Sequence, residues 1–264
     1  MNNAIGVFDS GVGGLTVARE IMRQLPNETI YYFGDVKNCP YGDKTKEEII
    51  KNTDRAVKFL IDKGVKLVVL ACNTATAAAL EYLQSKYEVP IIGVVQPGAR
   101  RAIQATENNK VLVLGTKFTA NSKVYDIEIE NINSDIIVFD KACPAFVPFI
   151  ESEGNLDKEA TKELISDTLG KTNMLGVDTV VLGCTHYPIL KKDIEDYYGN
   201  NIKVISSGRE AAREVSTVLG YAKLHQKKLN KKEHRFFISE ESDNFNSIAS
   251  KWLKKDINAE VVEI

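Results

Sequence analysis

The chain alternates between short apolar runs of strand length and longer segments with the apolar spacing of helices. The runs are bounded by glycine, proline or polar residues, and they lie at residues 4–8, 29–33, 66–71, 90–95, 111–115, 135–139, 178–183 and 202–205. Because they are rich in β-branched residues without polar alternation, they predict strands covered on both faces. Alternating strands and helices are typical of parallel sheets with right-handed crossovers, so the sequence predicts an α/β fold.

The predicted strands also repeat in order along the chain. IGVFDS pairs with VLVLGT, YYFGDVKNCP with IIVFDKACP, and LVVLACNTAT with TVVLGCTHYP. The offset between matched residues is steady, because Cys39 and Cys143 are 104 positions apart and Cys72 and Cys184 are 112 apart. We therefore expect two pseudo-symmetric lobes, each a mostly parallel sheet flanked by helices, with the active site in the cleft between them.

The lobe boundaries follow from this repeat. We expect the first lobe at residues 1–96 and the second at 97–207, followed by a tail with a helix at 209–229, a strand at 235–239, a helix at 244–253 and a strand at 260–264. The tail has no counterpart after the first lobe and is too small for a core of its own. We therefore expect residues 208–264 to pack on the first lobe.

Composition narrows the function classes. The 264 residues include 34 Lys+Arg and 36 Asp+Glu, a formal net charge of −2, which argues against a nucleic-acid partner. The lysine-rich stretch at 223–232 is interpreted as a solvated helix end and loop. No apolar run reaches the roughly 20 residues that cross a bilayer, and the amino terminus lacks a secretory signal pattern. We expect a cytoplasmic protein without a membrane partner.

Two of the four cysteines occupy matched positions. Cys72 and Cys184 each follow an apolar strand core and precede a polar turn that leads into a helix, where open α/β sheets bind ligands. A thiol at a helix amino terminus has its pKa lowered from about 8.5 toward roughly 3.5–7.5. The free N–H groups there also bind carboxylates. The side chains expected to cap these helices are Asn73, Thr74 and Thr185.

Facing lobes would present two thiols to opposite sides of one ligand. One thiolate then removes a proton from one face of a carbon while the other thiol supplies a proton to the opposite face, which inverts the carbon without a cofactor. Four charged residues are candidates for tuning the thiols: Asp9 and Asp35 near Cys72, and His186 and Glu151 on the Cys184 side.

Other candidate features favour structural interpretations. Cys39 and Cys143 match each other, but they lie outside the predicted strand-end turns, and His225 and His234 are expected to face solvent. The glycines at 11–14 lack the GK[ST] ending of a phosphate loop and the third glycine of a dinucleotide site, so they favour a turn close to a small ligand. The cysteines show no CxxC spacing, so we expect no metal site.

Two alternatives to a two-thiol racemase remain open from the residues themselves. One is a single-base enzyme, such as a decarboxylase or isomerase of small dicarboxylates. The other is a two-lobed binding protein that closes over an amino acid without reacting. The presence of both cysteines favours the racemase over either alternative.

Taken in order, the motifs resemble those of the glutamate racemases, in the aspartate/glutamate racemase superfamily. They are IGVFDSGVGGLTV at 5–17, YFGDVKNCPYG at 32–42, VVLACNTATA at 68–77, ACPAFVP at 142–148 and VVLGCTHYP at 180–188. The resemblance implies a cofactor-independent enzyme that interconverts L- and D-glutamate, supplies D-glutamate for bacterial peptidoglycan, and forms a homodimer.

The resemblance also assigns roles. Cys72 and Cys184 match the two catalytic cysteines, of which the first deprotonates D-glutamate and the second L-glutamate. The substrate-binding positions implied are Asp9, Ser10, Tyr41, Gly42, Asn73, Thr74, Thr185 and His186, with Thr116 and Thr119 near the α-carboxylate. Asp35 and Glu151 match acidic residues that assist catalysis. Related members act on aspartate, hydantoins or other dicarboxylates, so relaxed specificity stays open.

Overall fold

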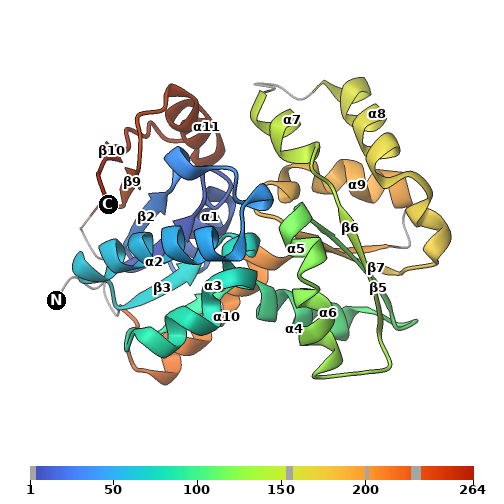
Figure 1. The fold of residues 1–264 in the computed structure, drawn as a ribbon, viewed down its shortest axis with the longest axis horizontal. Helices are drawn as coiled ribbons and strands as arrows, with labels where there is room; N and C mark the ends of the chain where they lie inside the picture. Colours follow the sequence, from blue (N-terminus) through green and yellow to red (C-terminus); the bar gives the residue numbers. More distant parts are fainter. Residues whose placement is uncertain (1–3, 153–156, 200–201, 227–232) are drawn as a thin grey trace. The chain divides into compact units, whose positions relative to one another are not determined.

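The protein is an α/β fold made of two compact units. The computed structural model describes residues 4–152, 157–199, 202–226 and 233–264. One unit comprises Met1–Val94 with Gly208–Ile264, and the other comprises Val95–Ser207 (Figure 1). Each contains one sheet in which every strand pairing is parallel. The predicted fold class of two parallel sheets flanked by helices is confirmed.

The first unit holds a six-stranded sheet in the order β10-β9-β2-β1-β3-β4. Its strands are β1 (Ile5–Asp9), β2 (Ile30–Gly34), β3 (Leu67–Leu70), β4 (Ile91–Gly93), β9 (Arg235–Ile238) and β10 (Glu260–Val261). Its helices are α1 (Leu15–Gln24), α2 (Lys46–Asp62), α3 (Asn73–Lys86), α10 (Ser207–Tyr221) and α11 (Asp243–Leu253), with one-turn 3₁₀ helices η1 (Val36–Asn38) and η2 (Tyr41–Asp43). Because β9 pairs with β2, the last part of the chain belongs to this sheet.

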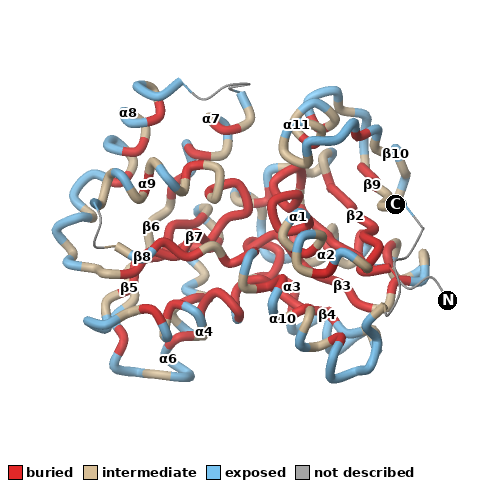
Figure 2. The backbone as a smooth tube through the Cα atoms, turned by 180° about the vertical axis from the view of Figure 1, so that it is seen from behind, coloured by how far each residue is buried: buried red, intermediate tan, exposed pale blue. Residues whose placement is uncertain are grey.

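Alternate residues of the strands face opposite layers of helices. Val7 and Tyr32 belong to a buried cluster with residues of α1, α10 and α11. On the other face, the Phe33 ring lies 5.3 Å from the ring of Phe59 in α2. The strands β2 and β3 are accordingly buried along their whole length (Figure 2). This two-sided burial explains why their sequences read as continuous apolar runs.

The second unit holds a four-stranded sheet in the order β6-β5-β7-β8. Its strands are β5 (Lys110–Gly115), β6 (Ile137–Ala142), β7 (Thr179–Gly183) and β8 (Lys203–Ser206). Its helices are α4 (Val95–Ala105), α5 (Lys117–Asn121), α6 (Val124–Glu130), α7 (Phe146–Ser152), α8 (Lys158–Leu169) and α9 (Lys191–Tyr198), with 3₁₀ helices η3 (Gly170–Leu175) and η4 (Tyr187–Leu190). Helices α4 and α6 cover one face of the sheet, and α8 and α9 pack together on the other (Figure 1).

Several predicted element boundaries are wrong; the strand expected at 260–264, for example, covers only Glu260–Val261. The strand expected at 135–139 lies at Ile137–Ala142, because six residues of β6 pair in register with β5 and polar positions are tolerated at this sheet edge. The helix expected at 209–229 ends at Tyr221, where Lys223 adopts a left-handed φ of 55°; residues 227–229 lie outside the described part of the chain. The division between the two units falls after Val94, two residues before the lobe boundary expected after Gln96.

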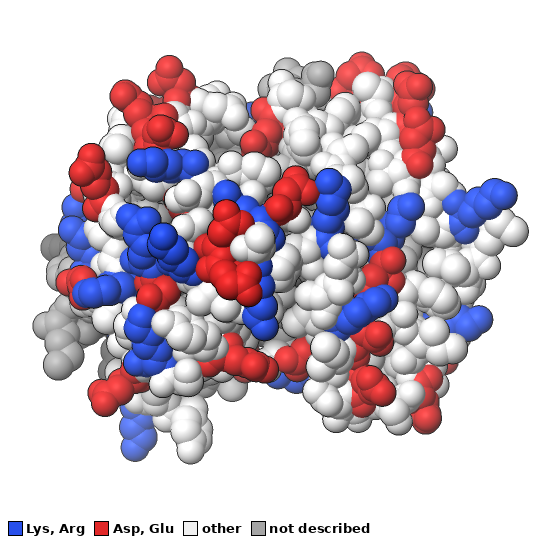
Figure 3. Space-filling view, in the orientation of Figure 1, with Lys and Arg blue, Asp and Glu red and all other residues white. Residues whose placement is uncertain are grey.

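On one face of the molecule, charged residues do not segregate by sign. On the face drawn in Figure 3, lysine and arginine side chains are interspersed with aspartate and glutamate. This pattern agrees with the formal net charge of −2. Within the described ranges, no helix combines the length and the apolar content needed to cross a membrane.

Candidate active site

The first half-site, which we define as the residues at the carboxyl ends of β1, β2 and β3, contains Cys72. This cysteine follows β3 and is itself the N-cap of α3, where its Sγ accepts a hydrogen bond from the backbone N–H of Ala75 at 3.4 Å. The thiol also lies 3.6 Å from the Ser10 hydroxyl and is 6% exposed. A backbone N–H at a helix amino terminus stabilises negative charge on the sulfur. The expectation that Asn73 and Thr74 cap this helix is wrong, because they are its first two residues.

Asp9 and Ser10 lie beside this thiol at the end of β1. Asp9 is fully buried, and its Oδ1 accepts a hydrogen bond from the backbone N–H of Gly11 at 3.0 Å. The Tyr32 hydroxyl donates to the carbonyl of Gly11 at 2.7 Å. Burial, followed by the negative charges of Asp9 and Cys72, raises the pKa of Tyr32 well above its usual value. Tyr32 therefore stays a neutral donor that fixes the loop after β1.

Within the turn at residues 11–14, Gly14 packs directly against the Asp9 side chain. A Cβ atom at Gly14 would lie 2.4 Å from the Asp9 Cβ and 2.9 Å from the Tyr32 hydroxyl. Such distances are below any real Cβ contact, so a side chain at this position must displace Asp9.

Replacing Gly14 by alanine should therefore destabilise the protein by about 1–3 kcal/mol, the usual cost of overpacking a buried site. Chemical denaturation of the wild type and the variant would measure the change in the free energy of unfolding. Gly220→Ala is the matched control, because a Cβ there meets only His225, at 3.6 Å, within the exposed end of α10. We expect the control to be neutral or stabilising. Equal stability of Gly14→Ala and the wild type would contradict the packing argument.

Asp35 and Tyr41 form a buried pair at the end of β2. The Tyr41 hydroxyl donates to Asp35 Oδ2 at 2.6 Å, and the Asn38 amide and the Ser239 hydroxyl also donate to the same carboxylate. Burial and the adjacent Asp35 charge raise the pKa of Tyr41, so its phenol stays protonated. The Asp35 carboxylate thus accepts hydrogen bonds from Tyr41, Asn38 and Ser239, and its place near Cys72 stays a prediction.

The second half-site, which we define as the residues at the carboxyl ends of β5 and β7 with Glu151, contains Cys184. This cysteine follows β7 and is 6% exposed. Its Sγ lies 3.9 Å from His186 Nδ1, and the other ring nitrogen, Nε2, lies 2.7 Å from Glu151 Oε1 in α7. The chain Cys184–His186–Glu151 thus joins three of the residues that the sequence predicted.

The contacts with Cys184 and Glu151 raise the pKa of His186 to about 10. Burial alone lowers the pKa, but hydrogen bonds to Cys184 and Glu151 and the charges of both partners raise it more. Both ring nitrogens donate in the protonated form, so an imidazolium matches a thiolate on one side and a carboxylate on the other. The arrangement favours a cation beside the Cys184 sulfur at neutral pH.

The segment after Cys184 differs from the segment after Cys72. It forms the short 3₁₀ helix η4, whose N-cap is His186 without a capping side chain, so the expectation that Thr185 caps an α-helix is wrong. The partner of the Cys184 sulfur is the imidazole of His186 rather than a helix backbone N–H. Two related strand ends therefore stabilise their sulfurs by different means.

Thr116 and Thr119 lie at the neighbouring strand end. Thr116 is the N-cap of α5, where its hydroxyl accepts from the Thr119 N–H at 3.2 Å and donates to the Thr119 hydroxyl at 3.1 Å. Gly115 pairs with Gly183 across β5 and β7, so Thr116 and Cys184 leave the sheet at the same level. The structure thus brings this predicted binding position beside the second cysteine.

Three smaller expectations need revision. Cys143 directly follows β6, so it does lie at a strand end, but it is fully buried and burial raises the pKa of its thiol to about 12. Cys39 Sγ would lie 3.3 Å from a Cβ on Gly11, so it belongs to the loops of the first half-site. His234 does not face solvent, because its Nδ1 accepts from the Ile30 N–H at 3.0 Å.

Sequence reasoning missed several residues that support the site. Tyr187 donates from its hydroxyl to the carbonyls of Gly115 and Cys143, at 3.1 and 2.9 Å. Tyr32 holds the loop after β1, and Ser239 reaches Asp35 from 204 positions away. Tyr32 and Tyr187 lie within the motifs at 32–42 and 180–188, so the motifs could have indicated them, whereas nothing in the sequence marks Ser239. Among the described residues, no group of three His, Cys, Asp or Glu side chains is arranged to hold a metal ion.

The fold and the two half-sites define an α/β enzyme with one buried cysteine at a matched strand end in each of two units. A family model described as "Asp/Glu/Hydantoin racemase" matches residues 5–215. The chain belongs to this family, and it is therefore an isomerase of the amino-acid racemase type.

Relatives of known name agree with this assignment. The chain is 48% identical to a glutamate racemase of Staphylococcus haemolyticus over 264 residues, which cover 100% of this chain and 99% of the relative. Its structure is similar to glutamate racemase isoform RacE1 from Bacillus anthracis, with a TM-score of 0.95, 40% identity and coverage of 99% and 98%. It is also similar to a glutamate racemase from Francisella tularensis in complex with D-glutamate, with a TM-score of 0.92, 33% identity and coverage of 99% and 98%.

Proposed function

We propose that the enzyme interconverts L- and D-glutamate by two-base proton transfer at Cα, with Cys72 and Cys184 as the two bases. The observation that carries this proposal is that each unit holds a buried cysteine at a matched strand end, and each sulfur has its own polar support. That support is the Ala75 N–H for Cys72 and the His186–Glu151 pair for Cys184. The full-length similarity to glutamate racemases supports glutamate as the substrate.

The reaction balances without a redox or Lewis-acid step. With L-glutamate, the Cys184 thiolate removes the Cα proton, and the electron pair of the broken C–H bond stays on Cα as a carbanion that is delocalised into the α-carboxylate. The Cys72 thiol then donates its proton to the opposite face, which gives D-glutamate and leaves Cys72 as the thiolate. The reverse reaction starts from that state, because the two sulfurs have exchanged protonation states.

The remaining predicted residues bind the substrate or support the sulfurs. We propose that Asp9 assists Cys72, as His186 and Glu151 assist Cys184, since Asp9 is buried at the same strand end as the Ser10 hydroxyl that contacts the thiol. The proposed binding positions are Ser10, Tyr41, Gly42, Asn73, Thr74, Thr116, Thr119 and Thr185. Asp35 then acts through Tyr41, with which it shares a hydrogen bond.

The cellular role follows from the product. D-Glutamate made by this reaction would serve bacterial peptidoglycan synthesis and so maintain the cell wall and cell shape. We propose that the enzyme acts in the cytoplasm as a homodimer, on free glutamate, without a cofactor and without a nucleic-acid or membrane partner.

Incubation of the purified protein with L-glutamate in D2O tests the reaction directly. With chelator present and no cofactor added, we expect the circular dichroism of glutamate to decay to zero while deuterium enters Cα, as measured by mass spectrometry. L-Aspartate and L-glutamine run in parallel measure specificity. Deuterium exchange without loss of optical activity would favour a single-base enzyme, and binding without exchange would favour a binding protein, so either result would overturn the proposal.

A further inference from the structure

The Asp35 carboxylate is the centre of a directional chain of hydrogen bonds within the first unit. Asp35 is 1% exposed, and Ser239 Oγ donates to its Oδ1 at 2.8 Å. Ser239 Oγ in turn accepts from the Lys37 backbone N–H at 3.0 Å, so the single hydroxyl proton of Ser239 is committed to Asp35. The Tyr41 hydroxyl donates to Oδ2 at 2.6 Å. The buried carboxylate therefore accepts from Tyr41 on one oxygen and from Ser239 on the other, and the Asn38 amide donates to both.

We propose that Ser239 is a positioning residue for catalysis, which acts through Asp35 to hold Tyr41 and the adjacent Gly42 in place beside the Cys72 half-site. The inference rests on the proposed function, in which Tyr41 and Gly42 bind the substrate. It extends that function to the carboxyl-terminal part of the chain, because Ser239 directly follows β9. When the Ser239 hydroxyl is lost, the Asp35 carboxylate shifts toward its remaining donors. Because Tyr41 is one of these donors, its position changes with that of the carboxylate.

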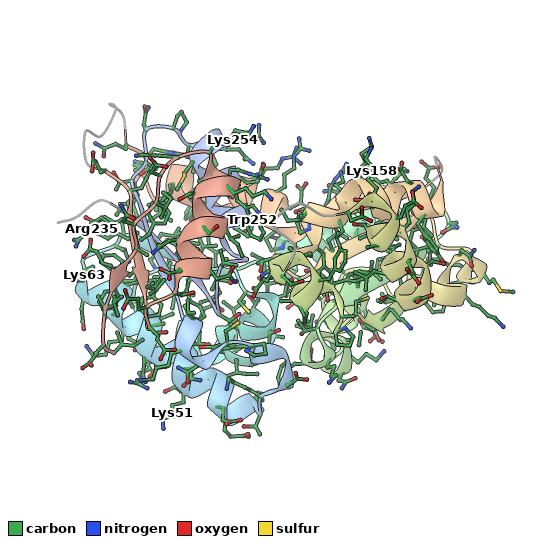
Figure 4. All side chains as sticks on the ribbon, turned by 90° about the horizontal axis from the view of Figure 1, so that it is seen from above. Lys51, Lys63, Lys158, Arg235, Trp252 and Lys254 are labelled. Carbon is green, nitrogen blue, oxygen red and sulfur yellow. The ribbon has the colours of Figure 1, made fainter. Side chains whose placement is uncertain are left out.

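The backbone of Ser239 is held independently of its hydroxyl. Strand β9 pairs with β2 up to Gly34 and Ile238, and the Ser239 N–H donates to the Gly34 carbonyl at 3.2 Å. Upstream in β9, the ring centre of Phe237 lies 4.8 Å from the Arg235 guanidinium and 5.6 Å from the ammonium of Lys63, which follows α2. Arg235 and Lys63 are labelled in Figure 4. Removing the hydroxyl therefore changes the environment of Asp35 while the strand keeps its place.

A cavity beside the hydrogen-bonded residues Ser239 and Asp35 leaves room for the conservative variant Ser239→Thr. It has a volume of about 350 Å³, and its lining includes Asp35, Asn38, Asn52, Arg55 and Ser239. The space allows threonine at position 239 to place an additional methyl group while keeping the hydroxyl. Ser239→Thr should therefore preserve the bond to Asp35, whereas Ser239→Ala removes it.

Kinetics of these variants test the inference. We expect Ser239→Ala to lower kcat/KM for glutamate racemisation about tenfold, mainly through KM because Tyr41 is a binding residue, and Ser239→Thr to restore it to within about twofold. Ser242→Ala is the matched control. This variant also loses one hydrogen bond to a serine hydroxyl, the one from the Phe245 N–H, but that hydroxyl has no bond to Asp35. The control should keep wild-type kinetics even if it lowers the melting temperature. Equal kinetics of Ser239→Ala and wild type would overturn the inference.

A double-mutant cycle with Tyr41→Phe identifies the route of the effect. If Ser239 acts through Tyr41, Ser239→Ala should change kcat/KM less than about twofold in the Tyr41→Phe background. The same tenfold loss in both backgrounds would overturn the proposed route. Absence of racemisation by the wild type would instead reject the proposed function, so the two failures are distinguishable.

Discussion

Replacing Cys72 or Cys184 by serine should lower glutamate racemisation by about a thousandfold or more, the range in which a positioned acid–base group contributes. In the proposed two-base mechanism, each variant lacks one of the two proton carriers that the reaction needs. A serine hydroxyl holds its proton far too tightly to be ionised at neutral pH, even beside the Ala75 N–H or the His186 imidazole. Circular dichroism of L-glutamate over time measures the loss.

Isotope exchange distinguishes this mechanism from simple damage to the site. Cys72→Ser retains Cys184, the base proposed for L-glutamate, so we expect slow exchange of the Cα hydrogen of L-glutamate for deuterium without inversion. Cys184→Ser should show the same exchange with D-glutamate. Mass spectrometry combined with chiral chromatography reads both outcomes in a single experiment.

Cys143→Ala provides the control for cysteine loss within the second unit. The Cys143 thiol is fully buried, and burial raises its pKa to about 12, so it does not ionise near neutral pH. Cys143→Ala should keep turnover within a few-fold of the wild type. Near-wild-type turnover of Cys72→Ser or Cys184→Ser would contradict the two-base mechanism.

The fold was predictable from the sequence where strands are buried on both faces. β2, β3 and β7 read as continuous apolar runs because helices cover both of their sides. The strand β6 lies at a sheet edge and contains Asp140 and Lys141, so its apolar part marks only half of the strand. The apolar pattern reports burial, and it loses accuracy where burial ends.

Individual contacts within the site were predictable only between neighbours in sequence, although Glu151 was placed on the Cys184 side. His186 lies two positions from Cys184, and their contact follows from the motif. Glu151 reaches His186 from 35 positions away, and Ser239 reaches Asp35 from 204. Such contacts depend on how strands order themselves in the sheet, which local patterns do not specify. The predicted cap of α3 was wrong for another reason, because Cys72 itself occupies the capping position expected for Asn73.

Replacing His186 by glutamine should lower kcat/KM about a hundredfold, because it removes the cation beside the Cys184 sulfur. The variant should also lose a pH-dependent part of the stability. The pKa of His186 is raised from 6.5 to about 10 in the folded protein, so its stabilising contribution is fully present below pH 6.5 and is lost as the pH rises through 10. Urea denaturation between pH 6 and 10 should show this decline in the wild type and a flatter curve in the variant.

Isotope effects locate the side on which His186 acts. Two enantiomers in water have an equilibrium constant of one, so kcat/KM must fall by the same factor in both directions, and rates alone cannot assign a side. If His186 supports Cys184, proton removal from L-glutamate becomes the slower step in His186→Gln. The deuterium isotope effect on kcat/KM should then be larger with Cα-deuterated L-glutamate than with the D-enantiomer. Equal isotope effects would show that His186 supports both sulfurs alike, and a larger effect with the D-enantiomer would assign it to Cys72.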